Sequence, residues 1–133
     1  MGNQKENALV IEVIPEAFSV CKVADYSGID IDQPFVFTGR TDEEKSLVCP
    51  TRLVPASTES REDGWRAFRI VGELDFSLVG ILAEIAGLLA AGKISIFAVS
   101  TYNTDYVLTR EKSFQEALKI LEKAGFVIAG EGF

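Results

Sequence analysis

The fold of this chain is constrained most by two segments with the hydrophobic spacing of helices. Each segment lies between β-rich runs and is followed by a glycine. The first runs from Leu78 to Ala91, and Asp75 or Ser77 stands where an N-cap residue would. Gly92 follows in the C′ position that favours a left-handed backbone. Its apolar residues recur every three or four positions, as one buried stripe: Leu78, Ile81, Leu82, Ile85, Leu88 and Leu89.

The second segment begins with the capping box Ser113-x-x-Glu116 and is followed by Gly125. Its expected inner face consists of Phe114, Ala117, Leu118 and Leu121. Strands are predicted at 66–71, 94–99, 105–109 and 126–129. Apolar residues occupy both faces of the run 94–99, which is typical of a central strand. The order β-α-β-β-α-β predicts an α+β, ferredoxin-like fold.

The first half of the chain repeats this pattern only in part. A strand is predicted at Ala17–Ala24, and a hairpin joins runs 34–38 and 46–49 around an acidic turn. This hairpin is similar to the one predicted at 97–109, although two hairpins in a β-rich chain can look alike by chance. We therefore expect two modules in tandem that share a mostly antiparallel sheet: residues 1–60, short of one helix, and residues 61–133.

Composition excludes several classes of function. The chain has no histidine, which excludes Ser-His-Asp and Cys-His triads and His-ligated zinc. Its net charge of −7 disfavours nucleic acid and anionic membranes as partners. Cys21 and Cys49 are expected to be buried, reduced thiols, although a disulfide is possible. We predict no metal site, no cofactor and no catalysis, and a soluble protein in the cytoplasm, since no signal peptide or membrane-spanning run is visible.

The residues from Trp65 onward resemble an ACT domain, a regulatory module of amino-acid metabolism that binds small ligands. The resemblance rests on Gly80-Ile-Leu-x-x-Ile-x-x-Leu-Leu-Ala-x-Gly92-x-Ile-Ser-Ile. The stretches 72–80 and 96–108 are more specifically similar to a bacterial subfamily of short tandem ACT proteins and to the eukaryotic arginine sensors called CASTOR proteins. Segments like Ser46–Pro50 and Arg52–Pro55 also occur in the bacterial subfamily.

The resemblance implies a ligand site between the first strand–helix loop and the second strand, at the edge where two modules meet. Exposed amides at a helix N-terminus favour a carboxylate, and an acidic side chain can hold an ammonium group. Asp105 would be the anionic contact. The residues implied are Asp75, Phe76, Ser77, Leu78, Val79, Gly80, Ile96, Thr101, Tyr102 and Asp105.

Structural roles remain open for the same residues. Asp75 and Ser77 are both candidate helix caps, and Asp105 could be a solvated hairpin residue. The resemblance implies a non-catalytic regulatory protein that binds a free amino acid or a similar metabolite at a module or subunit interface, as a homodimer. The alternative is a structural or dimerisation module that docks on an enzyme of amino-acid metabolism without binding a ligand.

Overall fold

The computed structural model describes residues 9–71 and 80–130 of the chain. It divides into two compact units, one of Met1–Pro15 with Arg66–Phe133 and one of Glu16–Trp65. Two long strands, β1 (Val10–Lys22) and β4 (Ser60–Val71), contribute residues to both units. The boundary predicted between residues 60 and 61 therefore falls at the start of a strand, and the division into two modules stays a prediction.

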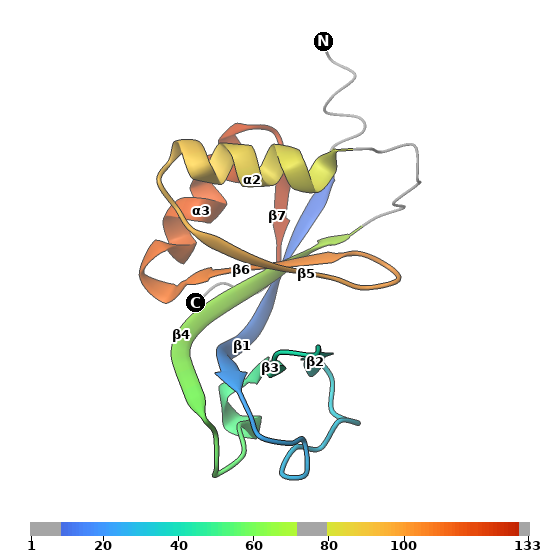
Figure 1. The fold of residues 1–133 in the computed structure, drawn as a ribbon. Helices are drawn as coiled ribbons and strands as arrows, with labels where there is room; N and C mark the ends of the chain where they lie inside the picture. Colours follow the sequence, from blue (N-terminus) through green and yellow to red (C-terminus); the bar gives the residue numbers. More distant parts are fainter. Residues whose placement is uncertain (1–8, 72–79, 131–133) are drawn as a thin grey trace. The chain divides into compact units, whose positions relative to one another are not determined.

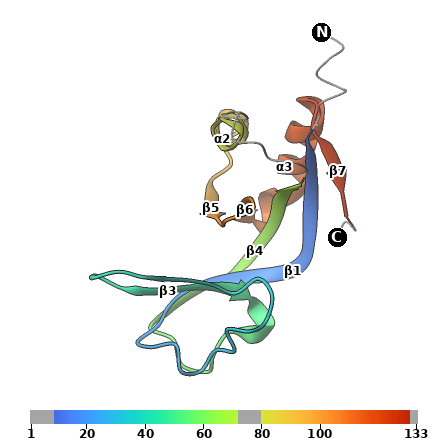
Figure 2. The same ribbon diagram turned by 90° about the vertical axis from the view of Figure 1, so that its right-hand side faces the viewer.

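From β4 onward the larger unit has the predicted β-α-β-β-α-β order, and β1 adds a further strand to its sheet. After β4 come α2 (Ile81–Ala91), β5 (Ile96–Ser100), β6 (Asp105–Arg110), α3 (Glu111–Lys123) and β7 (Val127–Ala129). Its strands lie in the order β7-β1-β4-β6-β5, with β7 parallel to β1 and β5 antiparallel to β6. Figures 1 and 2 show both helices on the same face of this sheet.

The core of the larger unit lies between that sheet face and the two helices. The inner residues predicted for the second helix are buried, and Ile85 and Leu89 of α2 join them. Alternating residues of the strands complete the cluster, as period-two patterning requires. These strand residues are Ile11, Val13, Phe68, Ile70 and Val107. The helix faces were therefore predicted correctly from the hydrophobic spacing.

The smaller unit is built on strands. Its sheet contains β2 (Phe37–Arg40) and β3 (Lys45–Pro50), both antiparallel to their neighbours, with Ser19 opposite Cys49 and Thr38 opposite Leu47. A single 3-10 turn, η1 (Thr51–Leu53), follows, and residues 16–65 contain no α-helix. A second hydrophobic cluster, with Cys21, Leu47 and Cys49 fully or almost fully buried, lies within this unit.

Several boundaries differ from those predicted. Strand β1 begins at Val10, well before the predicted start at Ala17, and β4 begins at Ser60 within the predicted loop. The prediction of a central strand at 94–99 was wrong, because β5 lies at the edge of the sheet. Its apolar residues are only half-buried, since one long side of the strand has no neighbour among the described strands.

The helix ends also differ from the sequence predictions. Helix α3 begins at Glu111, and its N-cap residue Arg110 makes no side-chain capping bond, so Ser113 lies inside the first turn and no capping box forms. Gly92 has φ −87°, and the left-handed conformation falls instead on Lys93, at φ 64°. A Cβ on Gly92 would lie 2.6 Å from Cδ1 of Ile120, so this glycine allows α3 to approach closely.

Candidate functional site

The predicted site residues that the structure brings together lie around the turn between β5 and β6. The backbone N–H of Thr101 donates to the carbonyl of Thr104 at 2.8 Å, and the Thr101 hydroxyl donates to the same carbonyl at 2.9 Å. The hydroxyl of Thr101 is therefore engaged in the turn itself. Tyr102, at the tip, is fully exposed (101%).

Asp105 stands where the turn enters β6. It is half-buried, lies opposite Ser100 in the antiparallel register, and its Oδ1 accepts a hydrogen bond from the Ser100 hydroxyl at 2.6 Å. Its second oxygen, Oδ2, accepts no hydrogen bond from the described residues. The turn thus presents a carboxylate whose orientation is fixed through one oxygen while the other can accept a ligand's N–H group.

A further hydroxyl joins this turn to the end of β4. The Thr104 hydroxyl donates to the backbone carbonyl of Ile70 at 2.6 Å, and Ile70 itself is buried in the core. Thr104 was not singled out from the sequence, because its partner lies 34 residues away. The bond ties the turn that carries Asp105 to the strand after which the predicted ligand loop begins.

Gly80 is the N-cap residue of α2, and its φ of 89° lies in the left-handed region. Gly80 itself makes no side-chain capping bond, and the N–H of Glu84 donates to the carbonyl of Gly80 at 2.8 Å. A Cβ on Gly80 would meet nothing within 4 Å, so its backbone conformation, not close packing, requires glycine here. Figures 1 and 2 place the start of α2 on the same side of the larger unit as the β5–β6 turn.

Of the remaining predicted residues, the structure describes only Ile96, which does not join this group. Ile96 begins β5 opposite Thr109 and packs against the core, about 13 Å along the strand from Ser100. Asp75, Phe76, Ser77, Leu78 and Val79 lie outside the described residues. The described part of the site therefore consists of the β5–β6 turn and Gly80, the N-cap residue of α2.

A polar network on three neighbouring strands was also missed from the sequence. Arg69 of β4 donates through Nε to Glu12 of β1 at 2.9 Å and through a terminal nitrogen to the Tyr106 hydroxyl of β6 at 3.0 Å. The hydrogen bond to Tyr106, supported by the Glu12 carboxylate, raises the pKa of Arg69. Its partners are 57 and 37 residues away, so only the strand order reveals it.

The two cysteines show no sign of reactivity. Both are buried and free, and burial raises the pKa of each thiol, to about 11 for Cys49. A reactive cysteine requires a thiolate, which burial disfavours here. Among residues 9–71 and 80–130, no group of three or more Cys, Asp or Glu side chains could hold a metal ion.

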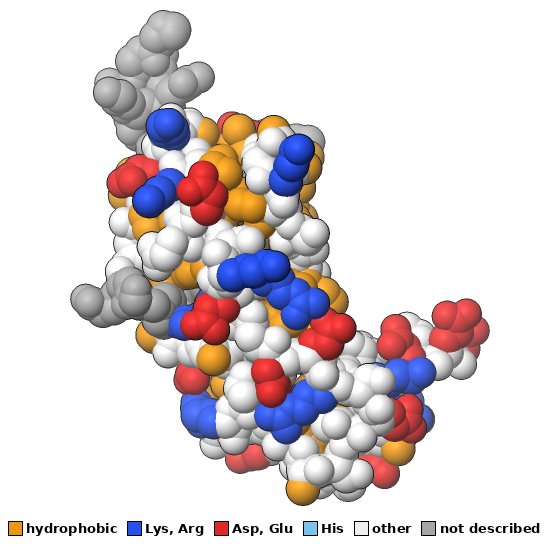
Figure 3. Space-filling model, turned by 90° about the vertical axis from the view of Figure 1, so that its left-hand side faces the viewer, with side chains coloured by type: hydrophobic (Ala, Val, Ile, Leu, Met, Phe, Trp, Pro, Cys, Tyr) orange, Lys and Arg blue, Asp and Glu red, His pale blue; other side chains and the backbone are white. Residues whose placement is uncertain are grey.

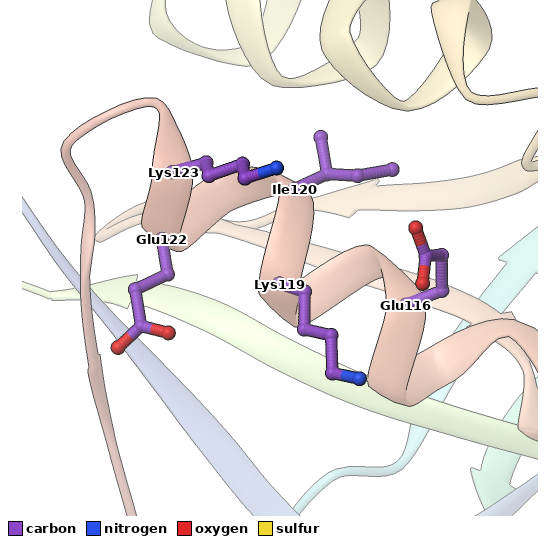
Figure 4. A pocket seen from close by; sticks show the side chains of 5 residues that line it. All are labelled: Glu116, Lys119, Ile120, Glu122 and Lys123. Carbon is purple, nitrogen blue, oxygen red and sulfur yellow. The ribbon is translucent and has the colours of Figure 1, made fainter.

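A depression of about 470 Å³ lies along α3, away from the predicted site. Figure 4 shows its lining, which comes from this helix alone: Glu116, Lys119, Ile120, Glu122 and Lys123. Figure 3 shows lysines and arginines interspersed with acidic residues on the face it displays. No helix in the described part of the chain is long and apolar enough to cross a membrane.

Comparisons with known proteins match the second half of the chain to a family model. Residues 60–123 match the family model of the ACT domain. The chain is 40% identical over 83 residues to the cytosolic arginine sensor for mTORC1 subunit 1 of Homo sapiens, over 62% of this chain and 25% of that protein. The matching segment thus spans a quarter of the relative's length.

Solved structures show the same fold over nearly the whole chain. A crystal structure of a protein from Agobacterium tumefaciens has a TM-score of 0.84 at 25% identity, covering 95% of this chain and 96% of that one. The ligand-free regulatory subunit of aspartate kinase from Thermus thermophilus has a TM-score of 0.59 at 12% identity, covering 86% and 95%. The fold is therefore ACT-like α+β, with two helices on one face of a curled, mostly antiparallel sheet.

Proposed function

Because residues 60–123 match the family model of the ACT domain, we propose that this protein is a non-catalytic regulatory module that binds a free amino acid. The ligand would lie at a module or subunit interface of a homodimer, against the β5–β6 turn and the start of α2. Two ACT-like modules in tandem, residues 1–60 and 61–133, belong to the same proposal. The name of the human relative, a cytosolic arginine sensor, supports the amino-acid ligand and a place in the cytoplasm.

The observation that carries the proposal is the half-buried carboxylate of Asp105, held by Ser100 with one oxygen available. An ammonium or guanidinium group is the natural partner of such an oxygen. The start of α2, where the N-cap residue is a glycine, lies on the same side of the unit and offers backbone amides to a carboxylate. A free amino acid carries both an ammonium group and a carboxylate, and a cationic amino acid carries a second positive group on its side chain.

The test is a thermal-shift screen of the full chain with the twenty amino acids, followed by calorimetry. A ligand at one hundred times its Kd adds about 2.7 kcal/mol of stability. The variant Asp105→Asn keeps an oxygen for Ser100 but removes the charge, so we expect the affinity to fall at least about tenfold. Asp42→Asn, in the exposed turn of the smaller unit, is the matched control and should bind as the wild type does.

A protein whose midpoint no amino acid raises at millimolar concentration would contradict the proposal. The alternative is then a structural or dimerisation module that docks on an enzyme of amino-acid metabolism. Among the described strands, β5 has no neighbour along one long side, which favours that alternative, because an edge strand can recruit a partner without any ligand. A stable dimer in the absence of amino-acid binding would support it.

A further inference from the structure

The β2–β3 and β5–β6 hairpins close with the same hydrogen-bonded turn. In β2–β3, the N–H of Thr41 donates to the carbonyl of Glu44 at 2.9 Å, and the N–H of Glu44 donates to the Thr41 hydroxyl at 3.2 Å. In β5–β6, Thr101 and Thr104 form the same two bonds, at 2.8 Å and 3.4 Å. The two hairpins can therefore be compared position by position.

The residue pairs that flank the two turns differ in charge. Ser100 stands opposite Asp105 across the β5–β6 hairpin. At the equivalent place in the β2–β3 hairpin, Arg40 stands opposite Lys45. The hairpin of the smaller unit thus carries two positive side chains where the hairpin of the larger unit carries a hydroxyl and a carboxylate.

The register places the two positive side chains next to each other. Thr41 and Glu44 share the hydrogen bond of the turn, and hydrogen-bonded and non-hydrogen-bonded pairs alternate, so Arg40 and Lys45 form a non-hydrogen-bonded pair. The carbonyl of Lys45 agrees with this, since it accepts the Val23 N–H at 2.9 Å, on the side away from β2. The Cα atoms of such a pair lie about 4.5 Å apart, so both side chains leave the same face from adjacent positions.

This arrangement is unfavourable within the hairpin itself, because like charges directly opposite each other destabilise a sheet. Arg40 is exposed and Lys45 half-buried, and neither forms an ion pair with any residue that the structure describes, the acidic turn 42–44 included. Hydrogen bonds from Ser27 lower the pKa of Asp25, to which Lys45 adds only the smallest contribution. The fold thus tolerates a repulsion that no described ion pair relieves.

We propose that Arg40 and Lys45 form a binding site for the carboxylate group of a small molecule. The planar guanidinium fork of arginine matches a carboxylate through two parallel hydrogen bonds, and the ammonium group of lysine adds a second positive charge beside it. The acidic residues 42–44 of the same turn repel a dianion more than a monoanion, so the site favours a carboxylate over a phosphate. The inference concerns a hairpin other than that of Asp105, so it goes beyond the proposed function.

The stability of a neutral variant is the first test. Arg40→Gln removes one of two opposed like charges, so we expect the Tm of the full chain to rise by about 1–4 °C at low salt, and by less in 1 M sodium chloride. Lys22→Gln is the matched control, because it makes the same change in net charge at an exposed position of β1, opposite Ser46, and should not raise the Tm. If Arg40 instead serves to balance the acidic turn 42–44, Arg40→Gln would lower the Tm, and this result would overturn the proposal.

The second test is a titration of the full chain with sodium acetate, followed by NMR at the Arg40 and Lys45 side chains, against sodium chloride at equal ionic strength. We expect saturable shifts with acetate alone. The affinity should fall at least about tenfold in Arg40→Gln/Lys45→Gln and stay unchanged in Lys22→Gln. Shifts that do not saturate, equal binding by the double variant, or tighter binding of inorganic phosphate than of acetate would each contradict the assignment.

The outcome is independent of the site at Asp105. Asp105→Asn should leave the acetate shifts at Arg40 and Lys45 unchanged, and the double variant should bind an amino acid as the wild type does. A chain that binds an amino acid but no acetate at Arg40 and Lys45 would overturn this inference alone. Acetate binding there by a chain that binds no amino acid would support the inference and contradict the proposed function.

Discussion

At the scale of single residues, hydroxyl groups organise the candidate site. Ser100, Thr101 and Thr104 each form a side-chain hydrogen bond close to Asp105 in the sequence, and the bond of Thr104 is the one that reaches a strand outside this hairpin. Thr101 was expected to contact a ligand, whereas its hydroxyl bonds within the turn. Asp105 is thus the residue of this group that retains capacity for a ligand.

We expect Thr104→Val to lower the free energy of unfolding by about 1 kcal/mol, because it removes the donor to the Ile70 carbonyl while keeping the branched shape. Thr104→Ser retains a hydroxyl and should recover most of this loss. Urea denaturation of the two variants measures the difference. Equal stability of the two would show that the hydrogen bond contributes nothing.

At the scale of elements, the two helices are stabilised differently. α3 buries a continuous apolar face, whereas α2 buries only Ile85 and Leu89 among its described residues and contains Gly87. Gly87 allows no close approach of another segment, because it is exposed and a Cβ there would meet nothing within 4 Å.

Gly87→Ala should therefore raise the free energy of unfolding by about 0.5–1 kcal/mol, since alanine restricts the unfolded chain and favours the helix. Gly80→Ala, at the other end of the same element, should lower it by about 1–2 kcal/mol, because φ 89° is strained for any residue with a Cβ. Guanidinium denaturation of this pair checks both signs. A stabilising Gly80→Ala would contradict the argument from φ.

At the scale of the whole molecule, stability depends on pH through the buried thiols. The pKa of Cys49 is raised from 9.0 to about 11 by burial, so the folded chain holds this proton more tightly than the unfolded chain does. Its contribution is complete below about pH 9 and is lost as the pH rises through about 11.

We therefore expect the free energy of unfolding to fall between pH 9 and pH 11, and to fall less steeply in Cys49→Ala. Tyrosines ionise over the same range, so the difference between wild type and variant, from urea denaturation at each pH, is the quantity to measure. The cavity left in the variant lowers its free energy of unfolding by a similar amount at every pH, so the cavity does not account for a difference in slope between the variant and the wild type. Identical slopes would show that the thiol proton is not held by the fold.

The sequence by itself determined the order of strands and helices in the larger unit and the inner face of α3. Hydrophobic periodicity is a local property, and burial of one face follows from it wherever the helix packs. The turn at 101–104 and the position of Asp105 at its end were predictable for the same reason. These features account for most of the fold and for the anionic residue of the candidate site.

Only the tertiary structure decided which strand lies at the edge, which hydroxyl joins the turn to β4, and how Arg69 connects Glu12 with Tyr106. Each depends on neighbours that are distant in the sequence. The apolar run of β5 predicts a central strand because the sequence shows which residues are hydrophobic but not which neighbouring segments cover them. The physical reason is that these side-chain hydrogen bonds join residues 34 to 57 positions apart on neighbouring strands, where no local pattern specifies the partner.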